Sequence, residues 1–314
     1  TARFRSKGST GRLAMADPVA LVSLMLDAAL GWPDRLYRWV GHPVGAFARL
    51  IALFERRWNR PEFDDQSRRL LGMLSVLLLV AVVGGGLAMI EAVLRSLMGS
   101  LAWIVLALLA FPGLAQRSLF DHVRPIARRL AERDLPAARE AVGRIVGRDV
   151  DDLDAAGVAR AAIESLAESF CDGVIAPLFW LLVGGLPGLW IYKAINTADS
   201  MIGHREARWR AYGWAAARLD DVLNLVPARI SGVMLCIAGA GGWRTLLRDH
   251  GKHASPNAGW PEAAMAGGLG LRLAGPLRYD GVVLDKPWIG SGRIDATGAD
   301  IDRALRLYVR ACGL

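Results

Sequence analysis

Two long stretches without a charged residue dominate the pattern of apolar and polar positions along the chain. They cover 70–90 and 97–116, and only six residues, 91–96, separate them. About 20 consecutive apolar residues cross the hydrocarbon core of a bilayer as a helix. The pattern therefore predicts a tight hairpin of two membrane-spanning helices.

Three further apolar stretches, 19–30, 173–192 and 225–242, are broken by charged residues, prolines or glycines. Each half of 173–192 has about ten residues, too few to cross a bilayer alone. Broken helices are tolerated at membrane depth where they are buried in protein or line a cavity. For 174–195 we favour a re-entrant hairpin over a kinked span, because a plain span would put its polar flanks on opposite faces.

The arginines around the hairpin predict its orientation. Residues 35–69 contain eight arginines and 117–133 contain five, whereas the link 91–96 contains one. Because Lys and Arg are enriched on the cytoplasmic side of membrane proteins, we expect both flanks in the cytoplasm and the link outside.

Composition supports a membrane protein with substantial aqueous parts. Hydrophobic residues make up 53% and charged residues 22% of the chain, and the mean hydropathy is +0.29. These values exclude a disordered, fibrous or nucleic-acid-binding chain. The net charge is +8, and residues 1–14 carry four basic residues and no acid. We interpret 1–14 as a basic leader or remnant before a native start at Met15.

The three cysteines, Cys171, Cys236 and Cys312, have no metal-ligand spacing. An odd number makes no disulfide framework, so we interpret them as small buried hydrophobes in a reducing setting.

These patterns predict a mainly α, polytopic integral membrane protein, a helical bundle with broken or re-entrant helices and a small mixed C-terminal segment. Within 117–172, Asp134 and then Asp151 or Asp152 are candidate helix N-caps. In the tail, 279–281 reads as a hairpin turn and 299–311 as an amphipathic helix. The segments are an N-terminal membrane region 15–116, a cytoplasmic helical segment 117–172, a membrane-embedded region 173–242 and a cytoplasmic tail 243–314.

An acidic motif precedes the third apolar region. Glu164, Glu168 and Asp172 are spaced at i, i+4 and i+8. Like charges at this spacing destabilise a helix, and carboxylates beside an apolar segment are costly. A divalent cation would relieve both penalties, and Mg²⁺ prefers such oxygen ligands. A solvated acidic helix face is the alternative interpretation.

Three more polar motifs follow at intervals. Lys193, Asn196 and Asp199 nearly share a helix face, and 220–229 repeats the carboxylate–amide spacing before Arg229. The loop 255–262 leads into a helix N-terminus, which favours an anion. These motifs suit phosphate and metal binding, with helix capping, loop chemistry and snorkelling of Lys193 as alternatives.

Familiar nucleotide and zinc motifs are missing from the sequence. Gly251-Lys252 is followed by His253 rather than Ser or Thr, so there is no P-loop, and no strand leads into G-x-G-x-x-G. The five histidines show no zinc spacing. Any nucleotide would therefore bind in a site of uncommon design.

Taken together, the polar motifs resemble those of the CobD/CbiB family of cobalamin biosynthesis, the integral-membrane adenosylcobinamide-phosphate synthases. The resemblance covers most of 17–312. Ser169 stands where the family usually has Asn, and Ala48 where it usually has Gly. The motifs that carry the resemblance are Leu26-Asp27, Gly31-x-Pro33, His42-Pro43-Val44, 145–149, 161–165, 172–177, 193–203, 220–229 and 255–267.

The resemblance implies an ATP- and Mg²⁺-dependent carbon–nitrogen ligase. It would join adenosylcobyric acid to (R)-1-amino-2-propanol O-2-phosphate, through either an acyl phosphate or an adenylate. A non-catalytic AmpE-like membrane regulator or a corrinoid-binding protein is the alternative. The resemblance also implies the inner membrane with a cytoplasmic active site, and it leaves open the amine and whether the chain forms a homo-oligomer or joins later assembly enzymes.

From residue chemistry and the resemblance together we assign expected roles. The expected metal ligands are Glu164, Glu168, Asp172, Asp220 and Asp221. The expected catalytic residues are Glu164, Glu168, Lys193, Asp199 and Glu262. The expected substrate- and nucleotide-binding residues are His42, Asn196, Thr197, Ser200, Asn224, Arg229, Ser255 and Asn257.

Overall fold

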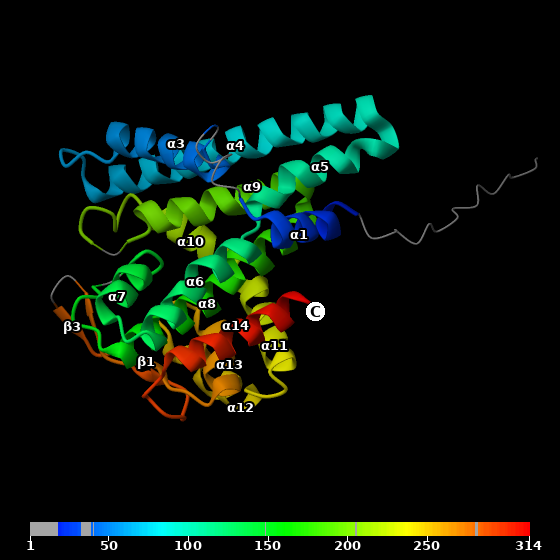
Figure 1. Cartoon of the computed structure of the whole chain (residues 1–314). Helices are drawn as coiled ribbons and strands as arrows, with labels where there is room; N and C mark the ends of the chain where they lie inside the picture. Colours follow the sequence, from blue (N-terminus) through cyan, green and yellow to red (C-terminus); the bar gives the residue numbers. More distant parts are fainter. Residues whose placement is uncertain (1–17, 33–38, 40, 148, 205, 280–281) are drawn as a thin grey trace, which may run out of the picture.

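The computed structural model describes residues 18–32, 39, 41–147, 149–204, 206–279 and 282–314. Its described part is mainly helical (Figure 1). The leader 1–14, Met15 and the turn residues 280–281 lie outside the described residues.

The N-terminal helices, together with parts of α9 and α10 from later in the chain, form one layer around an apolar core. This core joins α1 (Pro18–Leu30), α3 (Pro43–Trp58), α4 (Asp65–Met98), α5 (Ala102–Ala110), the second half of α9 (Ala176–Ile202) and α10 (Trp214–Leu223). Figure 1 shows α4 as a long helix with α5 returning along it. Asp64 caps α4 by accepting a hydrogen bond from the Ser67 backbone N–H at 2.6 Å.

The remaining helices build a second core below the first in the view of Figure 1. They are α6 (Gln116–Ala131), α7 (Leu135–Gly143), α8 (Ala155–Phe170), α11 (Leu225–Ala238), α12 (Trp243–Asp249), α13 (Gly259–Leu269) and α14 (Gly298–Cys312). Two short antiparallel ladders join β1 (Leu273–Ala274) to β4 (Trp288–Ile289) and β2 (Leu277–Tyr279) to β3 (Val282–Leu284).

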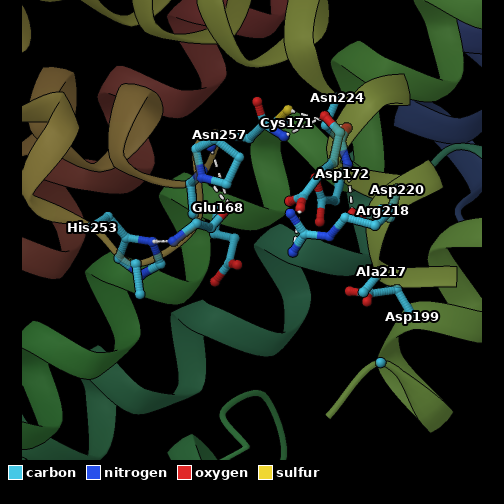
Figure 2. A pocket seen from close by; sticks show the side chains of 16 residues that line it. Glu168, Cys171, Asp172, Asp199, Ala217, Arg218, Asp220, Asn224, His253 and Asn257 are labelled. Carbon is cyan, nitrogen blue, oxygen red and sulfur yellow. Dashed lines mark hydrogen bonds and ion pairs between the residues drawn. The ribbon is translucent and has the colours of Figure 1, made fainter. Parts of the chain in front are cut away.

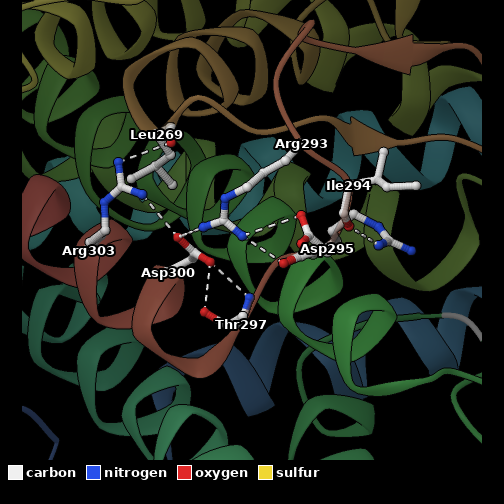
Figure 3. A network of polar contacts seen from close by, with 8 residues as sticks. Leu269, Arg293, Ile294, Asp295, Thr297, Asp300 and Arg303 are labelled. Carbon is white, nitrogen blue, oxygen red and sulfur yellow. Dashed lines mark hydrogen bonds and ion pairs between the residues drawn. The ribbon is translucent and has the colours of Figure 1, made fainter.

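A buried carboxylate ties the C-terminal segment together. Asp300 is 1% exposed and accepts hydrogen bonds from Arg293, Arg303 and Thr297 (Figure 3). Its bond from the Thr297 backbone N–H completes a capping box at the start of α14. The amphipathic helix predicted at 299–311 is thus confirmed and firmly anchored.

Two sequence predictions about boundaries were wrong. The predicted link 91–96 is helical and lies within α4, where Glu91 and Arg95 form an i,i+4 ion pair. The chain instead reverses after Met98, where Gly99 has a φ of 55°. Asp154, not Asp151 or Asp152, caps α8, whereas the predicted cap at Asp134 is confirmed.

Among the described residues, two helical stretches, 65–131 and 155–202, are long and apolar enough to cross a membrane, or three if the bent pair α10–α11 counts as one. The predicted pair of spanning helices, 70–90 and 97–116, falls within the first stretch, and its second member forms only the nine-residue α5, which is too short to cross a bilayer alone. The second stretch turns back on itself. Gly185 adopts φ 61° and ψ −156° inside α9, and Glu91 caps the new helix start by accepting a hydrogen bond from the Leu186 backbone N–H at 3.1 Å. The segment therefore folds as a helical hairpin, as predicted for 174–195.

Candidate active site

A cavity of about 400 Å³ lies between the two cores, where the motifs of the sequence converge. Its walls come from the end of α8, the C-terminal end of α9, α10 and the loop before α13 (Figure 2). The predicted residues that line it are Glu168, Asp172, Asp199, Asp220, Asp221, Asn224, Ser255 and Asn257.

A π-helical turn, Cys171–Ile175, joins α8 to α9 at the cavity wall. A π turn adds a residue to the helical ring and re-aims the side chains that follow, and such turns are frequent at functional sites. The backbone carbonyl of Gly173 accepts a hydrogen bond from the Ala115 N–H at 2.9 Å. The turn that carries Asp172 is therefore held from outside its own helix.

Amides and carboxylates alternate in a continuous chain of hydrogen bonds at the cavity wall. The Asn196 amide donates to Asp172 and to Asp220, each at 3.2 Å. The Asn224 amide donates to the other oxygen of Asp220 at 3.0 Å. Asn224 is 2% exposed, and its carbonyl oxygen accepts from the Tyr192 hydroxyl at 3.1 Å. Every member is thus oriented by the next, as a preorganised site requires.

The loop 253–258 closes the other side of the cavity. The Ser255 hydroxyl oxygen accepts from the backbone N–H groups of Asn257 and Ala258. The Asn257 amide donates to the Asp221 carbonyl at 2.7 Å, and its oxygen accepts from Arg229 at the same distance. The loop is therefore tied to both α10 and α11.

His253 is a cavity residue that the sequence patterns did not single out. Its Nδ1 accepts from the Ser255 backbone N–H at 3.0 Å, so the ring proton sits on Nε2. That nitrogen lies 3.8 Å from the Glu262 carboxylate. Burial, together with the nearby charge of Lys286, lowers the pKa of His253. Glu262, a predicted catalytic residue, does not line the cavity.

Acidic side chains outnumber basic ones in the cavity wall. Five carboxylates line it, against the single guanidinium of Arg218 among the described lining residues. Arg218 pairs with Asp221 at 2.9 Å and keeps 56% of its side chain exposed. The sequence patterns did not single it out either, although an arginine three residues before the acid of an Asp-Asp pair is a weak signal. The arrangement favours a cationic ligand or an anion that brings its own metal.

Several predicted site residues lie outside this cavity. Glu164 accepts a hydrogen bond from the Ala274 N–H at 2.8 Å. It stands about 12 Å along the helix from Asp172, where β1 covers α8. Thr197 and Ser200 bond to backbone carbonyls four residues earlier in α9. Arg229 stacks over Trp260, 4.8 Å from the ring centre, behind the loop.

Lys193 and His42 line a second hollow of about 430 Å³ on the other side of α9. Lys193 still interacts electrostatically with Asp172 and Asp220. It therefore stands between the two hollows and balances part of the carboxylate charge.

The donor set fits a substrate-borne magnesium ion better than a metal cage built by the protein. Among the described residues, no three His, Cys, Asp or Glu side chains come close enough to hold a metal ion alone. The five predicted ligands are therefore not gathered at one point. Two carboxylates bridged by one amide, Asp172 and Asp220, match the usual pattern for Mg²⁺, which keeps substrate phosphates and waters as its other ligands.

Comparison with known proteins identifies the family. The model described as CobD/Cbib protein matches residues 20–308. A relative named Cobalamin biosynthesis protein CobD, from Rhodobacter capsulatus, is 50% identical over 93% of this chain and 92% of its own length. Relatives of the same name are 46% identical in Sinorhizobium sp (95% and 96% covered) and 44% identical in Rhizobium meliloti (94% and 93% covered). No solved structure matches. The chain therefore belongs to the CobD/CbiB family of cobalamin biosynthesis proteins.

Proposed function

We propose that this protein is an adenosylcobinamide-phosphate synthase, an ATP- and Mg²⁺-dependent ligase that joins adenosylcobyric acid to aminopropanol phosphate. The observation that carries the proposal is the hydrogen-bonded chain Asp172–Asn196–Asp220, which brings three separate motifs to one acidic cavity. Family membership supplies the biosynthetic pathway.

The proposed reaction must first activate a carboxylate. A carboxylate is a poor acyl donor because resonance and charge shield its carbon. Transfer of the γ-phosphoryl group of ATP to its oxygen gives an acyl phosphate and ADP. The free amine then attacks the acyl carbon, the amide bond forms, and phosphate leaves. Because little covalent chemistry falls to the protein, positioning and charge stabilisation dominate catalysis.

The cavity offers matching partners for each group. Asp172 and Asp220 are the proposed magnesium ligands, and Mg²⁺, when bound with the nucleotide, neutralises charge on the transferred phosphoryl group. Arg218 is the proposed phosphate ligand, because guanidinium groups bind phosphate oxygens in pairs. Asn257 and Ser255 are proposed to orient substrate oxygens at the loop.

The amine substrate suits the acidic wall. An amino-alcohol phosphate carries an ammonium group at neutral pH, and this group must lose a proton before it attacks. Asp199 and Glu168 line the cavity and are proposed to hold the ammonium group, with Asp199 accepting its proton. Lys193, set behind the wall, is proposed to tune the carboxylates rather than to bind nucleotide directly.

We further propose that the protein sits in the bacterial inner membrane with the cavity facing the cytoplasm, where ATP is available. Two features support this placement. The stretches that are apolar enough to cross a membrane are present, and the hairpin in α9 returns to the face from which it starts.

A single-turnover assay tests the function. Detergent-purified protein would be mixed with adenosylcobyric acid, aminopropanol phosphate, ATP and Mg²⁺, and the corrinoid and nucleotide products identified by mass spectrometry. We expect the amide product with ADP. Formation of AMP instead of ADP would indicate an adenylate intermediate rather than an acyl phosphate. Folded protein that makes no amide and hydrolyses no ATP would favour a regulator or corrinoid-binding protein.

A further inference from the structure

An apolar groove of about 610 Å³ lies along the pair of helices α4 and α5, away from the acidic cavity. It lies between α3, α4, α5 and the second half of α9. Every residue that lines it is apolar or glycine, among them Phe47, Val83, Leu109 and Trp190. No described polar side chain enters the groove, so only a hydrocarbon group can fill it favourably.

The groove meets the polar hollow that contains Lys193 and His42. Trp32 and Pro112 line both spaces. The Trp32 ring packs edge-on against His42, with centroids 5.2 Å apart, and lies 6.0 Å from Phe111. The two spaces together therefore have one polar end and one long apolar end.

The polar hollow is equipped to receive an anion. His42 Nδ1 accepts from the Val44 backbone N–H, and burial together with the charge of Lys193 lowers the pKa of His42. Its ring proton therefore sits on Nε2, where it is available to donate. The buried indole N–H of Trp32 has no hydrogen-bond partner among the described residues, although buried Trp N–H groups normally find one.

The N-terminus of α6 offsets part of the charge of the carboxylate in the hollow. Asp27 is the one carboxylate among the described lining residues. It is already engaged, since it accepts from the Gln116 backbone N–H at 2.5 Å and caps α6. His122 bonds through Nδ1 to the Ser118 carbonyl at 2.7 Å. Lys193 is the one lysine or arginine among the described lining residues, and it shares its charge with Asp172 and Asp220 on the other side of α9.

Along α4 and α5, the polar hollow is followed by the apolar groove, in the same order as the headgroup and acyl chain of a lipid. The polar hollow lies just after the end of α5, at Pro112 and Gly113. The groove extends from there along α4 towards Ile90. Of the side chains that line the groove, Val82, Ile90 and Leu108 are large, apolar and exposed. Basic pockets beside membrane helices are a recognised mode of anionic lipid binding.

We propose that these two spaces together form a binding site for one anionic phospholipid, with the phosphate headgroup in the polar hollow and an acyl chain in the groove. The inference rests on the cleft, its charges and the proposed placement in a membrane, and it does not depend on the proposed ligase reaction.

Two neighbouring glycines of α4 allow a matched test. Gly86 lines the groove, and a Cβ there would meet nothing within 4 Å, so Gly86→Phe fills the groove without a backbone clash. Gly85 is equally open but does not line the groove, so Gly85→Phe adds the same bulk elsewhere. Trp32→Phe keeps an aromatic ring at this position and removes the N–H donor together with part of the indole.

The measurement is native mass spectrometry of the detergent-purified full chain with phosphatidylglycerol or phosphatidylcholine of identical acyl chains. We expect phosphatidylglycerol to bind about tenfold better, Gly86→Phe to weaken it about tenfold and Gly85→Phe to leave it unchanged. Trp32→Phe should weaken phosphatidylglycerol binding about threefold. This variant provides a separate test if Gly86→Phe does not fold. Equal binding of both lipids, full binding by folded Gly86→Phe, or displacement of the lipid by millimolar glycerol phosphate would overturn the proposal.

Discussion

The amide of Asn196 donates a hydrogen bond to the carboxylate of Asp172 at 3.2 Å, although 24 residues separate them. In one straight helix, residues so far apart in sequence would lie about 36 Å apart. The bond exists because the chain reverses at Gly185, and it joins the two ends of the α9 hairpin at the cavity wall. The reversal is thus a condition for the site.

The first prediction concerns the hairpin turn. A Cβ at Gly188 would lie 2.4 Å from the Trp180 carbonyl oxygen, whereas a Cβ at Gly184 would meet nothing within 4 Å. We expect Gly188→Ala to destabilise the protein by about 1–3 kcal/mol, the usual cost of overpacking, and Gly184→Ala to have little effect. Thermal unfolding in detergent measures both, and equal unfolding temperatures would argue against the turn geometry.

The second prediction distinguishes Asp172, which lines the cavity, from Glu164, which lies outside it. Asp172→Asn should lower kcat at least about 100-fold, because it removes one of the two bridged carboxylates. Glu164→Gln should retain activity within about threefold, since its side chain still accepts from Ala274 outside the cavity. The assay is the ligation reaction on folded variants. A loss in Glu164→Gln as large as in Asp172→Asn would favour the helix face expected from spacing alone.

The third prediction concerns phosphate binding by Arg218. Loss of a charge-assisted contact costs about 1.5–3 kcal/mol, so Arg218→Gln should raise the KM for ATP about 10- to 100-fold. Arg144→Gln is the control, because Arg144 pairs with Glu140 on an exposed part of the surface. An unchanged KM for ATP in Arg218→Gln would remove Arg218 from the proposed site.

The fourth prediction is a pH dependence of stability. Asp249 is fully buried, and hydrogen bonds from Arg248, then Lys252 and the Gly290 N–H, hold its pKa well below the ordinary range. A lowered pKa in the folded state stabilises the protein above the unfolded pKa of about 3.9. This stabilisation is lost as the pH falls further.

Asp249→Asn should therefore destabilise the protein by about 1–3 kcal/mol near pH 7, and the difference should shrink below about pH 4. Unfolding temperatures of both proteins across pH 3–8 measure it. Glu132→Gln, at an exposed ion pair with Arg128, serves as control and should change stability by less than about 1 kcal/mol. A pH-independent gap for Asp249→Asn would contradict the assignment.

The fifth prediction tests the proposed orientation. Leu97, beside the turn between α4 and α5, is 79% exposed. Ser200 lies exposed near the C-terminal end of α9. A membrane-impermeant maleimide applied to intact cells should label Leu97→Cys and not Ser200→Cys. Permeabilised cells should label both. Labelling of Ser200→Cys from outside would place the cavity on the wrong side for cytoplasmic ATP.

The sequence was sufficient for the local elements and for the list of motifs. The uncharged run 70–90 predicted the apolar part of α4, and Asp134 marked a helix start, because apolar spacing and capping act within a few residues. The run 97–116 predicted a second spanning helix, but it forms only the short α5. The hairpin in α9 was also expected, from the need to bring Asp172 and Asn196 to one face. The family followed from the order of motifs along the chain.

Only the tertiary structure decided which side chains meet. Glu164 shares the helical spacing of Glu168, yet β1 covers it, and Lys193 turns to a hollow on the other side of α9 from the cavity. Arg218 enters the cavity because of where α10 packs. Spacing records position around one helix, whereas a site depends on how distant segments pack, and that packing is a property of the whole fold.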